Sequence, residues 1–287
     1  MPAQLAFIPG TIPDQPEPLA RFLPRLPQGV AAAWLSTAIP PGSWVIDPFG
    51  ASPRLAIETA QAGYRILVAA NNPITRFLLE MAAAPPSVAE FQAALAELAS
   101  SRRGSERLEP HIRSLYATRC DNCRREVIAE AFLWQRGAPG PHARIYACSH
   151  CGHHGEFPAT PEDIEKAASY SPGSLHRARA LERIAAIDDP DRAHAEEALD
   201  AYPPRAVYAL FTLINKLGGL GLAPERHRLL AALLISACDQ ANTLWPHPAP
   251  RPRPRQLHIP SIYRENNIWL ALENAIPEWT SPTKPVP

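Results

Sequence analysis

The residues with the clearest chemistry are four cysteines in two close pairs. Cys120 and Cys123 form one Cys-x-x-Cys motif, and Cys148 and Cys151 form another, with 24 residues between the two pairs. Each motif brings two thiolates to one side of a turn, and two such turns supply the four ligands of a tetrahedral Zn²⁺. Because four protein ligands close the coordination sphere, this spacing predicts a structural zinc site rather than a catalytic one.

Two other interpretations of these cysteines stay open: a redox-active dithiol pair, or free thiols in a core. His150, His153 and His154 follow the second motif closely enough to compete as ligands. The fifth cysteine, Cys238, lies in an apolar helical pattern and is interpreted as a small buried residue.

The segment between the two motifs has the pattern of a β-hairpin. Residues 126–146 alternate in polarity, carry Phe132, Trp134 and Ile145, and include the turn sequence Gly-Ala-Pro-Gly at 137–140. A hairpin with a cysteine turn at each end is a zinc ribbon, which we predict for residues 116–158.

Positive charge could add a nucleic-acid face to this ribbon, because arginines are frequent around it. A solvated basic edge explains the same residues equally well. The chain has 28 basic and 28 acidic residues, so any basic surface must be local. The arginines concerned are Arg102, Arg103, Arg107, Arg124, Arg125, Arg136 and Arg144.

A second chemical feature is the turn Asp-Pro-Phe-Gly-Ala-Ser-Pro at 47–53, which follows the apolar run 44–46. A helix is predicted from Pro53 to Gly63, then a strand over 64–69 and a second helix over 74–84. This alternation predicts a βαβ unit with parallel strands. A tight turn between a strand and a helix is a layout that binds nucleotide-type cofactors, although a βαβ unit without a cofactor is the alternative.

At this point the sequence resembles a known family, the amino-group DNA methyltransferases. Their S-adenosylmethionine-binding motif reads Asp-Pro-Phe-x-Gly-Ser-Gly and is followed by a second strand that ends in Asp-x-Asn-Pro. The counterparts here are residues 47–53 and Ala-Asn-Asn-Pro at 70–73. A ribbon after the cofactor half, with helices beyond it, resembles a subset of adenine-type DNA methylases, so the resemblance covers residues 42–157.

The resemblance implies an α/β fold with a Rossmann-like methyltransferase core, an inserted zinc-ribbon hairpin and a helical C-terminal part. It implies methyl transfer from S-adenosylmethionine to base amino groups of DNA. The residues implied to line the cofactor are Asp47, Phe49, Gly50, Ser52 and Asn71. Of these, Asp47 would contact the methionine end and Asn71 would stand at the ribose position.

The chain also departs from the family pattern. Ala51 and Pro53 stand where the family has glycines, and Asn71 stands where it has an acid. No (Asp/Asn/Ser)-Pro-Pro-(Tyr/Phe/Trp) motif occurs, so no catalytic residue can be named, and we expect a downstream segment or a second chain to supply it. The alternative is a non-catalytic zinc-ribbon subunit for nucleic-acid binding or assembly, with a degenerate methyltransferase-like core.

Proline marks the organisation of the chain. Of 34 prolines among 287 residues, nine lie in residues 1–41 and ten in residues 246–287. We predict a Pro-rich arm over 1–41, a cofactor-binding part over 42–115, the ribbon over 116–158, a helical region over 159–245 and a Pro/Arg-rich segment over 246–287.

Three shorter patterns refine these boundaries. A capping box at 87–90 predicts a helix to about residue 100, and the polar residues 101–107 are interpreted as a linker. The alternating Pro and Arg residues of 250–255 predict an extended segment, which could follow a phosphate backbone or an acidic groove. Tyr263 and Trp269 either line a DNA cleft or, as we favour, pack in a core.

The chain carries neither a signal-peptide pattern nor an apolar run approaching 18 residues. We therefore predict a cytoplasmic protein with no membrane partner. That compartment also favours a metal site over disulfides for the paired cysteines.

Overall fold

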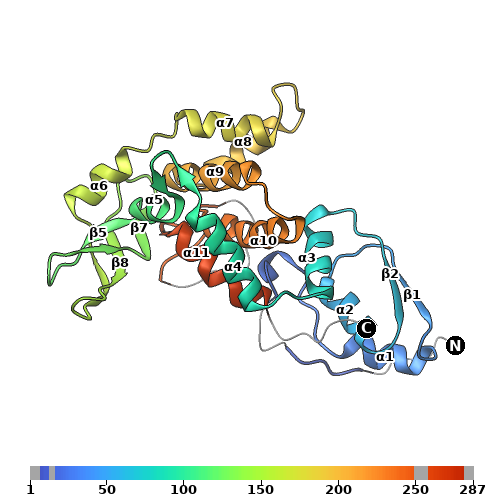
Figure 1. Ribbon diagram of the computed structural model, residues 1–287. Coiled ribbons are helices and arrows are strands. Elements are labelled where there is room, and N and C mark those ends of the chain that lie inside the picture. The colour runs from blue at the N-terminus through green and yellow to red at the C-terminus, as the bar shows by residue number, and fades with distance from the viewer. Residues whose placement is uncertain (1–6, 13–16, 249–257, 281–287) are drawn as a thin grey trace. The chain divides into compact units, whose positions relative to one another are not determined.

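The computed structural model describes residues 7–12, 17–248 and 258–280. Over these ranges the chain is mixed α/β, with eleven α-helices and ten short strands (Figure 1). It divides into two compact units, Met1–Val88 with Pro277–Pro287, and Ala89–Ile276. The predicted extended segment at 250–255 lies outside the described residues.

The first unit contains the predicted βαβ arrangement. β1 (Trp44–Asp47) and β2 (Arg65–Val68) are parallel and adjacent (Figure 1), and α2 (Pro53–Gln61) connects them. α3 (Pro73–Ala83) follows β2, so the predicted order of strands and helices is confirmed. The unit also contains the short 3₁₀ helix η1 (Ala20–Phe22) and α1 (Val30–Ala38), both within the predicted Pro-rich arm.

Side-chain caps explain why both helices begin where they do. Ser52 Oγ accepts a hydrogen bond from the Leu55 N–H at 3.3 Å, and Pro53 occupies the first turn of α2. At α3, Asn72 Oδ1 accepts from the N–H groups of Ile74 at 2.8 Å and of Thr75 at 3.3 Å. These oxygens satisfy backbone donors that have no partner within the helix, so the turns between strands and helices are fixed locally.

The second unit contains the ribbon. β5 (Ala117–Arg119) pairs with β6 (Glu126–Ile128), and a separate antiparallel sheet has the order β10-β7-β8-β9. Its strands are β7 (Ala131–Gln135), β8 (Ala143–Ala147), β9 (His154–Pro158) and β10 (Ile262–Asn266). β7 and β8 confirm the predicted hairpin, whereas β10 comes from the segment predicted to be Pro/Arg-rich.

Helices complete the second unit. Figure 1 shows α9 and α10 side by side. At the start of α6 a capping box forms between Thr160 and Asp163. Trp269 on α11 is fully buried, which confirms its predicted packing role. The helices are α4 (Val88–Ser100), α5 (Leu108–Ser114), α6 (Pro161–Ala168), α7 (Leu175–Ile184), α8 (Arg192–Asp200), α9 (Pro204–Gly219), α10 (Pro224–Gln240) and α11 (Ile268–Trp279).

Residues 101–107 are not the linker that we predicted. Arg102–Arg103 (β3) and Glu106–Arg107 (β4) form an antiparallel hairpin, and the Leu108 N–H donates to the Ser101 carbonyl at 2.8 Å. Gly104 has a φ of 65°, which the first position of its two-residue loop requires. Backbone pairing and turn chemistry therefore outweigh the polar composition of the segment.

No helix within the described ranges combines the length and apolar character needed to cross a membrane.

Candidate metal centre

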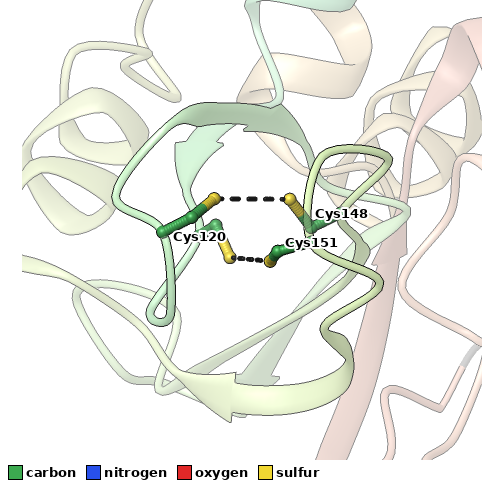
Figure 2. Close-up of side chains that lie close together, drawn as sticks. Cys120, Cys148 and Cys151 are labelled. Atoms are coloured by element: carbon green, nitrogen blue, oxygen red, sulfur yellow. Dashed lines mark hydrogen bonds between the residues drawn. The ribbon is translucent and has the colours of Figure 1, made fainter.

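The four predicted ligands converge at one place in the second unit. All four Sγ atoms lie within 4.8 Å of one another. Cys120 Sγ is 3.6 Å from Cys151 Sγ, and Cys123 Sγ is 3.7 Å from Cys148 Sγ, so the two turns face each other (Figure 2). A tetrahedral ion with metal–sulfur bonds of about 2.3 Å separates its ligands by ~3.8 Å, whereas a disulfide joins sulfurs at about 2.05 Å. The geometry therefore fits a shared metal ion, and the cysteines are free thiols rather than disulfides.

The two cysteine turns have the same backbone fold. In the first, between β5 and β6, the Arg124 N–H donates to the Cys120 carbonyl at 2.9 Å; in the second, between β8 and β9, the Gly152 N–H donates to the Cys148 carbonyl at 2.9 Å. Both donors are four residues after the first cysteine, and both have positive φ, 61° for Arg124 and 72° for Gly152. Glycine adopts this conformation without strain, whereas an arginine there costs roughly 1–2 kcal/mol.

Backbone donors around the sulfurs favour thiolates at part of the cluster. Burial opposes ionisation of Cys120, but the N–H groups of Cys123 and Asn122 stabilise its thiolate and lower the pKa of Cys120 to about 5. The pKa of Cys151 is also lowered, chiefly by the His153 N–H.

The neighbouring sulfurs oppose ionisation of Cys123. At Cys123 the Arg125 N–H lowers the pKa, but burial and the sulfurs of Cys148, Cys151 and Cys120 outweigh it and raise the pKa of Cys123 to about 11. Four thiolates at these distances repel one another, so a cation is the group that would allow all four to ionise together.

The three neighbouring histidines contact other atoms. His150 Nδ1 is 3.0 Å from Arg125 Nη1, and His154 Nδ1 is 2.8 Å from the Gly152 carbonyl. His153 Nδ1 lies 3.2 Å from Tyr146 Oη and 4.0 Å from Cys120 Sγ. The convergent ligand group in the described part of the chain is therefore the four cysteines, with His153 behind Cys120 in an outer position.

Arg144, one of the arginines expected at a basic surface, lies in the interior of the protein instead. Arg144 is fully buried on β8, where its Nη1 donates to Asp163 Oδ2 at 3.1 Å and its Nη2 donates to Asp121. A buried guanidinium needs such partners, and here they come from the N-terminus of α6 and from the first cysteine turn. Arg136 is also engaged, because its Nη1 donates to the Ile259 carbonyl at 2.9 Å.

The five predicted cofactor-binding residues lie at or just after the carboxyl ends of β1 and β2. Asp47 Oδ1 accepts hydrogen bonds from the N–H groups of Phe49 and Gly50, both at 3.0 Å. Phe49 is 82% exposed, and Asn71 is also exposed. Ser52 is the cap of α2. Two of the five therefore have a clear local structural role, and Phe49 and Asn71 are open to solvent.

At Gly50 the turn after β1 approaches the turn after β2 closely. Its φ is 55°, and a Cβ added there would lie 2.9 Å from the Cα of Ala70 in the turn after β2. Only glycine allows this approach without displacing backbone. The two turns thus lie in close backbone contact at the carboxyl edge of the parallel pair.

Sequence reasoning missed one polar cluster on β3–β4, α5 and α9. His111 Nδ1 is 3.2 Å from Glu106 Oε2, and His111 Nε2 is 2.9 Å from Tyr208 Oη. The Arg103 guanidinium lies over the Tyr208 ring, 5.3 Å from its centroid. The Gly-Ser pair between two short polar runs was the available signal, because such pairs favour two-residue hairpin loops.

Fold and site together define a mixed α/β protein with a four-cysteine cluster placed to bind a metal ion. No protein-family model, curated protein or solved structure matches this chain.

Proposed function

We propose that this chain is an S-adenosylmethionine-dependent methyltransferase, or the cofactor-binding part of one, that acts on base amino groups of DNA. The proposal rests on one observation: the turns that carry Asp47 and Asn71 lie next to each other at the carboxyl ends of two parallel strands. In open α/β sheets, ligands bind outside these strand ends. The β1–α2–β2–α3 order is the part of a Rossmann-like core that would hold the cofactor.

Each proposed contact uses a group that the turns leave available. Asp47 Oδ1 is taken up by two turn hydrogen bonds, so its other carboxylate oxygen would meet the ammonium of the methionine part. The exposed Asn71 amide would hydrogen-bond the ribose hydroxyls, and the exposed Phe49 ring would be covered by the ligand. Gly50 would allow close backbone approach.

A further segment or chain would supply the catalytic motif. Among the described residues, Trp44, Ile46 and Leu67 are 65%, 69% and 59% exposed, and the strand register places them on one face of the parallel pair. Parallel sheets are ordinarily covered on both faces, so this apolar face supports a core that is completed by additional structure.

We further propose that Cys120, Cys123, Cys148 and Cys151 hold one structural Zn²⁺. Four thiolates suit this ion, and their S···S distances of 3.6 and 3.7 Å agree with its tetrahedral geometry. When bound, the ion would tie the β5–β6 turn to the β8–β9 turn.

Elemental analysis tests the metal proposal. Purified protein and the Cys238→Ala control should each contain close to one zinc per chain, whereas Cys151→Ser should lose metal and the chelator-treated protein should lose ribbon structure. A metal-free protein with an intact ribbon would contradict the proposal. Cys238 is a suitable control because it lies on α10, outside the four-cysteine group.

Calorimetric titration of the zinc-loaded protein with S-adenosylmethionine tests the cofactor proposal. We expect saturable binding, weakened several-fold by Asn71→Ala because a hydrogen bond is lost. Glu80→Gln, an exposed change on α3 in the same unit, should leave binding unchanged. Absence of binding at millimolar cofactor would overturn the methyltransferase function for this chain.

A non-catalytic zinc-ribbon subunit, for nucleic-acid binding or assembly, is the second candidate. It is favoured by the absence of a Pro-Pro-aromatic motif and by Ala51 and Pro53 in the places of the family's glycines. This candidate predicts DNA or partner binding without any response to S-adenosylmethionine.

A further inference from the structure

The β3–β4 hairpin has two chemically different faces. Arg102 lies directly opposite Arg107, and Arg103 lies directly opposite Glu106. Residues opposite each other on antiparallel strands share a face, with Cβ atoms about 4.5–5.5 Å apart, and successive residues point to opposite faces. One face therefore carries Arg103 and Glu106, and the other carries two adjacent arginines.

The Arg103–Glu106 face anchors the hairpin. Glu106 Oε2 is 3.2 Å from His111 Nδ1 on α5, and the Arg103 guanidinium lies over the Tyr208 ring on α9. α5 is itself fixed by the fully buried Leu108. The hairpin is thus held against two helices, and its orientation is set by these contacts.

The other face is left with uncompensated positive charge. Arg102 and Arg107 are both exposed, and no carboxylate in the described part of the chain lies within ion-pair distance of either one. The hairpin's own carboxylate, Glu106, is directed at His111. Like charges directly opposite each other destabilise a strand pair, so an anion between them would relieve a repulsion that the fold leaves in place.

We propose that Arg102 and Arg107 form a binding site for a phosphate group. Two adjacent guanidiniums offer several N–H donors in planar forks, the arrangement that recognises phosphate oxygens bidentately. Because the anchored face fixes the hairpin, little ordering is needed when the phosphate binds. The assignment of this phosphate to the backbone of DNA rests on the proposed function, whereas the phosphate chemistry of the site does not.

The test compares two pairs of arginines in the same unit. The hairpin variant is Arg102→Ala/Arg107→Ala, and the control is Arg226→Ala/Arg228→Ala on α10, which removes the same charge from exposed positions. Binding of a fluorescein-labelled DNA duplex is followed by anisotropy over a series of salt concentrations. We expect the hairpin variant to bind at least about tenfold more weakly and to lower the magnitude of the salt slope by about 1 to 2, with a smaller effect for the control.

Two further arms separate the possible results. Arg102→Lys/Arg107→Lys keeps the charge and should restore only part of the affinity, because ammonium groups lack the bidentate fork. Competition with inorganic pyrophosphate should displace DNA from the wild type. If the wild type binds pyrophosphate through these arginines but does not bind DNA, the phosphate site is supported and its DNA source is wrong.

Equal losses in the hairpin and control variants, or a wild type that binds neither ligand, would overturn the site. Thermal unfolding of each variant checks that the fold is retained. S-adenosylmethionine titration of the hairpin variant should match the wild type, so failure of this site and failure of the cofactor proposal give different results.

Discussion

Replacing Glu265 by glutamine should destabilise the second unit far more than an equivalent change at the surface. Glu265 lies on β10 and is fully buried. Its carboxylate accepts hydrogen bonds from Arg205 Nε at 2.8 Å, from Arg205 Nη2 at 2.6 Å and from Trp134 Nε1 at 2.7 Å. These contacts connect the C-terminal strand β10 to α9 and to the neighbouring strand β7.

The magnitude follows from the burial of both partners. In Glu265→Gln, one oxygen becomes an NH₂ group that faces donors, and the buried Arg205 charge loses its counter-charge. The remaining contacts of Arg205 are a hydrogen bond to the Leu115 carbonyl at 3.2 Å and ring faces of Phe132 and Tyr116, which carry no net charge. Removing one partner of a buried pair costs roughly 3–5 kcal/mol of unfolding free energy.

Urea unfolding, followed by circular dichroism and tryptophan fluorescence, measures this loss. The matched control is Glu97→Gln, which removes the partner of Arg226 in an exposed pair at 2.8 Å and should cost about 0.2–1 kcal/mol. The double variant Arg205→Met/Glu265→Gln should recover much of the stability, because no unpaired charge stays buried. Equal losses for Glu265→Gln and Glu97→Gln would refute the reasoning.

Two further changes test the turn after β1 and the titration of His176 on α7. Gly50→Ala places a Cβ 2.9 Å from the turn after β2 and should cost roughly 1–3 kcal/mol in thermal unfolding. Gly42→Ala, with a φ of 81° but open space around it, should cost less, and equal costs would argue against the close approach. Burial, then Arg103 and Arg179, lower the pKa of His176. The unfolded chain therefore protonates His176 more readily than the folded chain does. The stability contributed by neutral His176 is present above about pH 6.5, and it is lost as the pH falls below that value. His176→Gln should flatten this dependence of melting temperature on pH, and an unchanged profile would contradict the assignment.

The βαβ part was predictable because its signals are local. Ser52 and Pro53 start α2, Asn72 and Pro73 start α3, and each cap reaches only two or three residues along the chain. The cysteine ligands were predictable for the same reason, since Cys-x-x-Cys spacing alone fixes two sulfurs on one side of a turn.

Two of the missed features, β10 and the burial of Arg144, depend on contacts between residues distant in sequence. β10 pairs with β7, so that Tyr263 lies opposite Trp134, and the composition of the Pro-rich C-terminal segment carries no sign of this partner. Arginine is ordinarily exposed, so both interpretations of the arginines around the ribbon, a nucleic-acid face or a solvated basic edge, place Arg144 at the surface. Its burial requires Asp163, which reaches it only when α6 begins beside the ribbon.

We propose above that the turns after β1 and β2 hold S-adenosylmethionine. Hydrogen–deuterium exchange of the zinc-loaded protein, with and without the cofactor, tests this binding site by site along the backbone. We predict slower exchange over residues 49–52 and 69–72 when the cofactor is present, and unchanged exchange over the β3–β4 hairpin. Unchanged exchange in both turns at millimolar cofactor, or protection confined to the second unit, would contradict the claim.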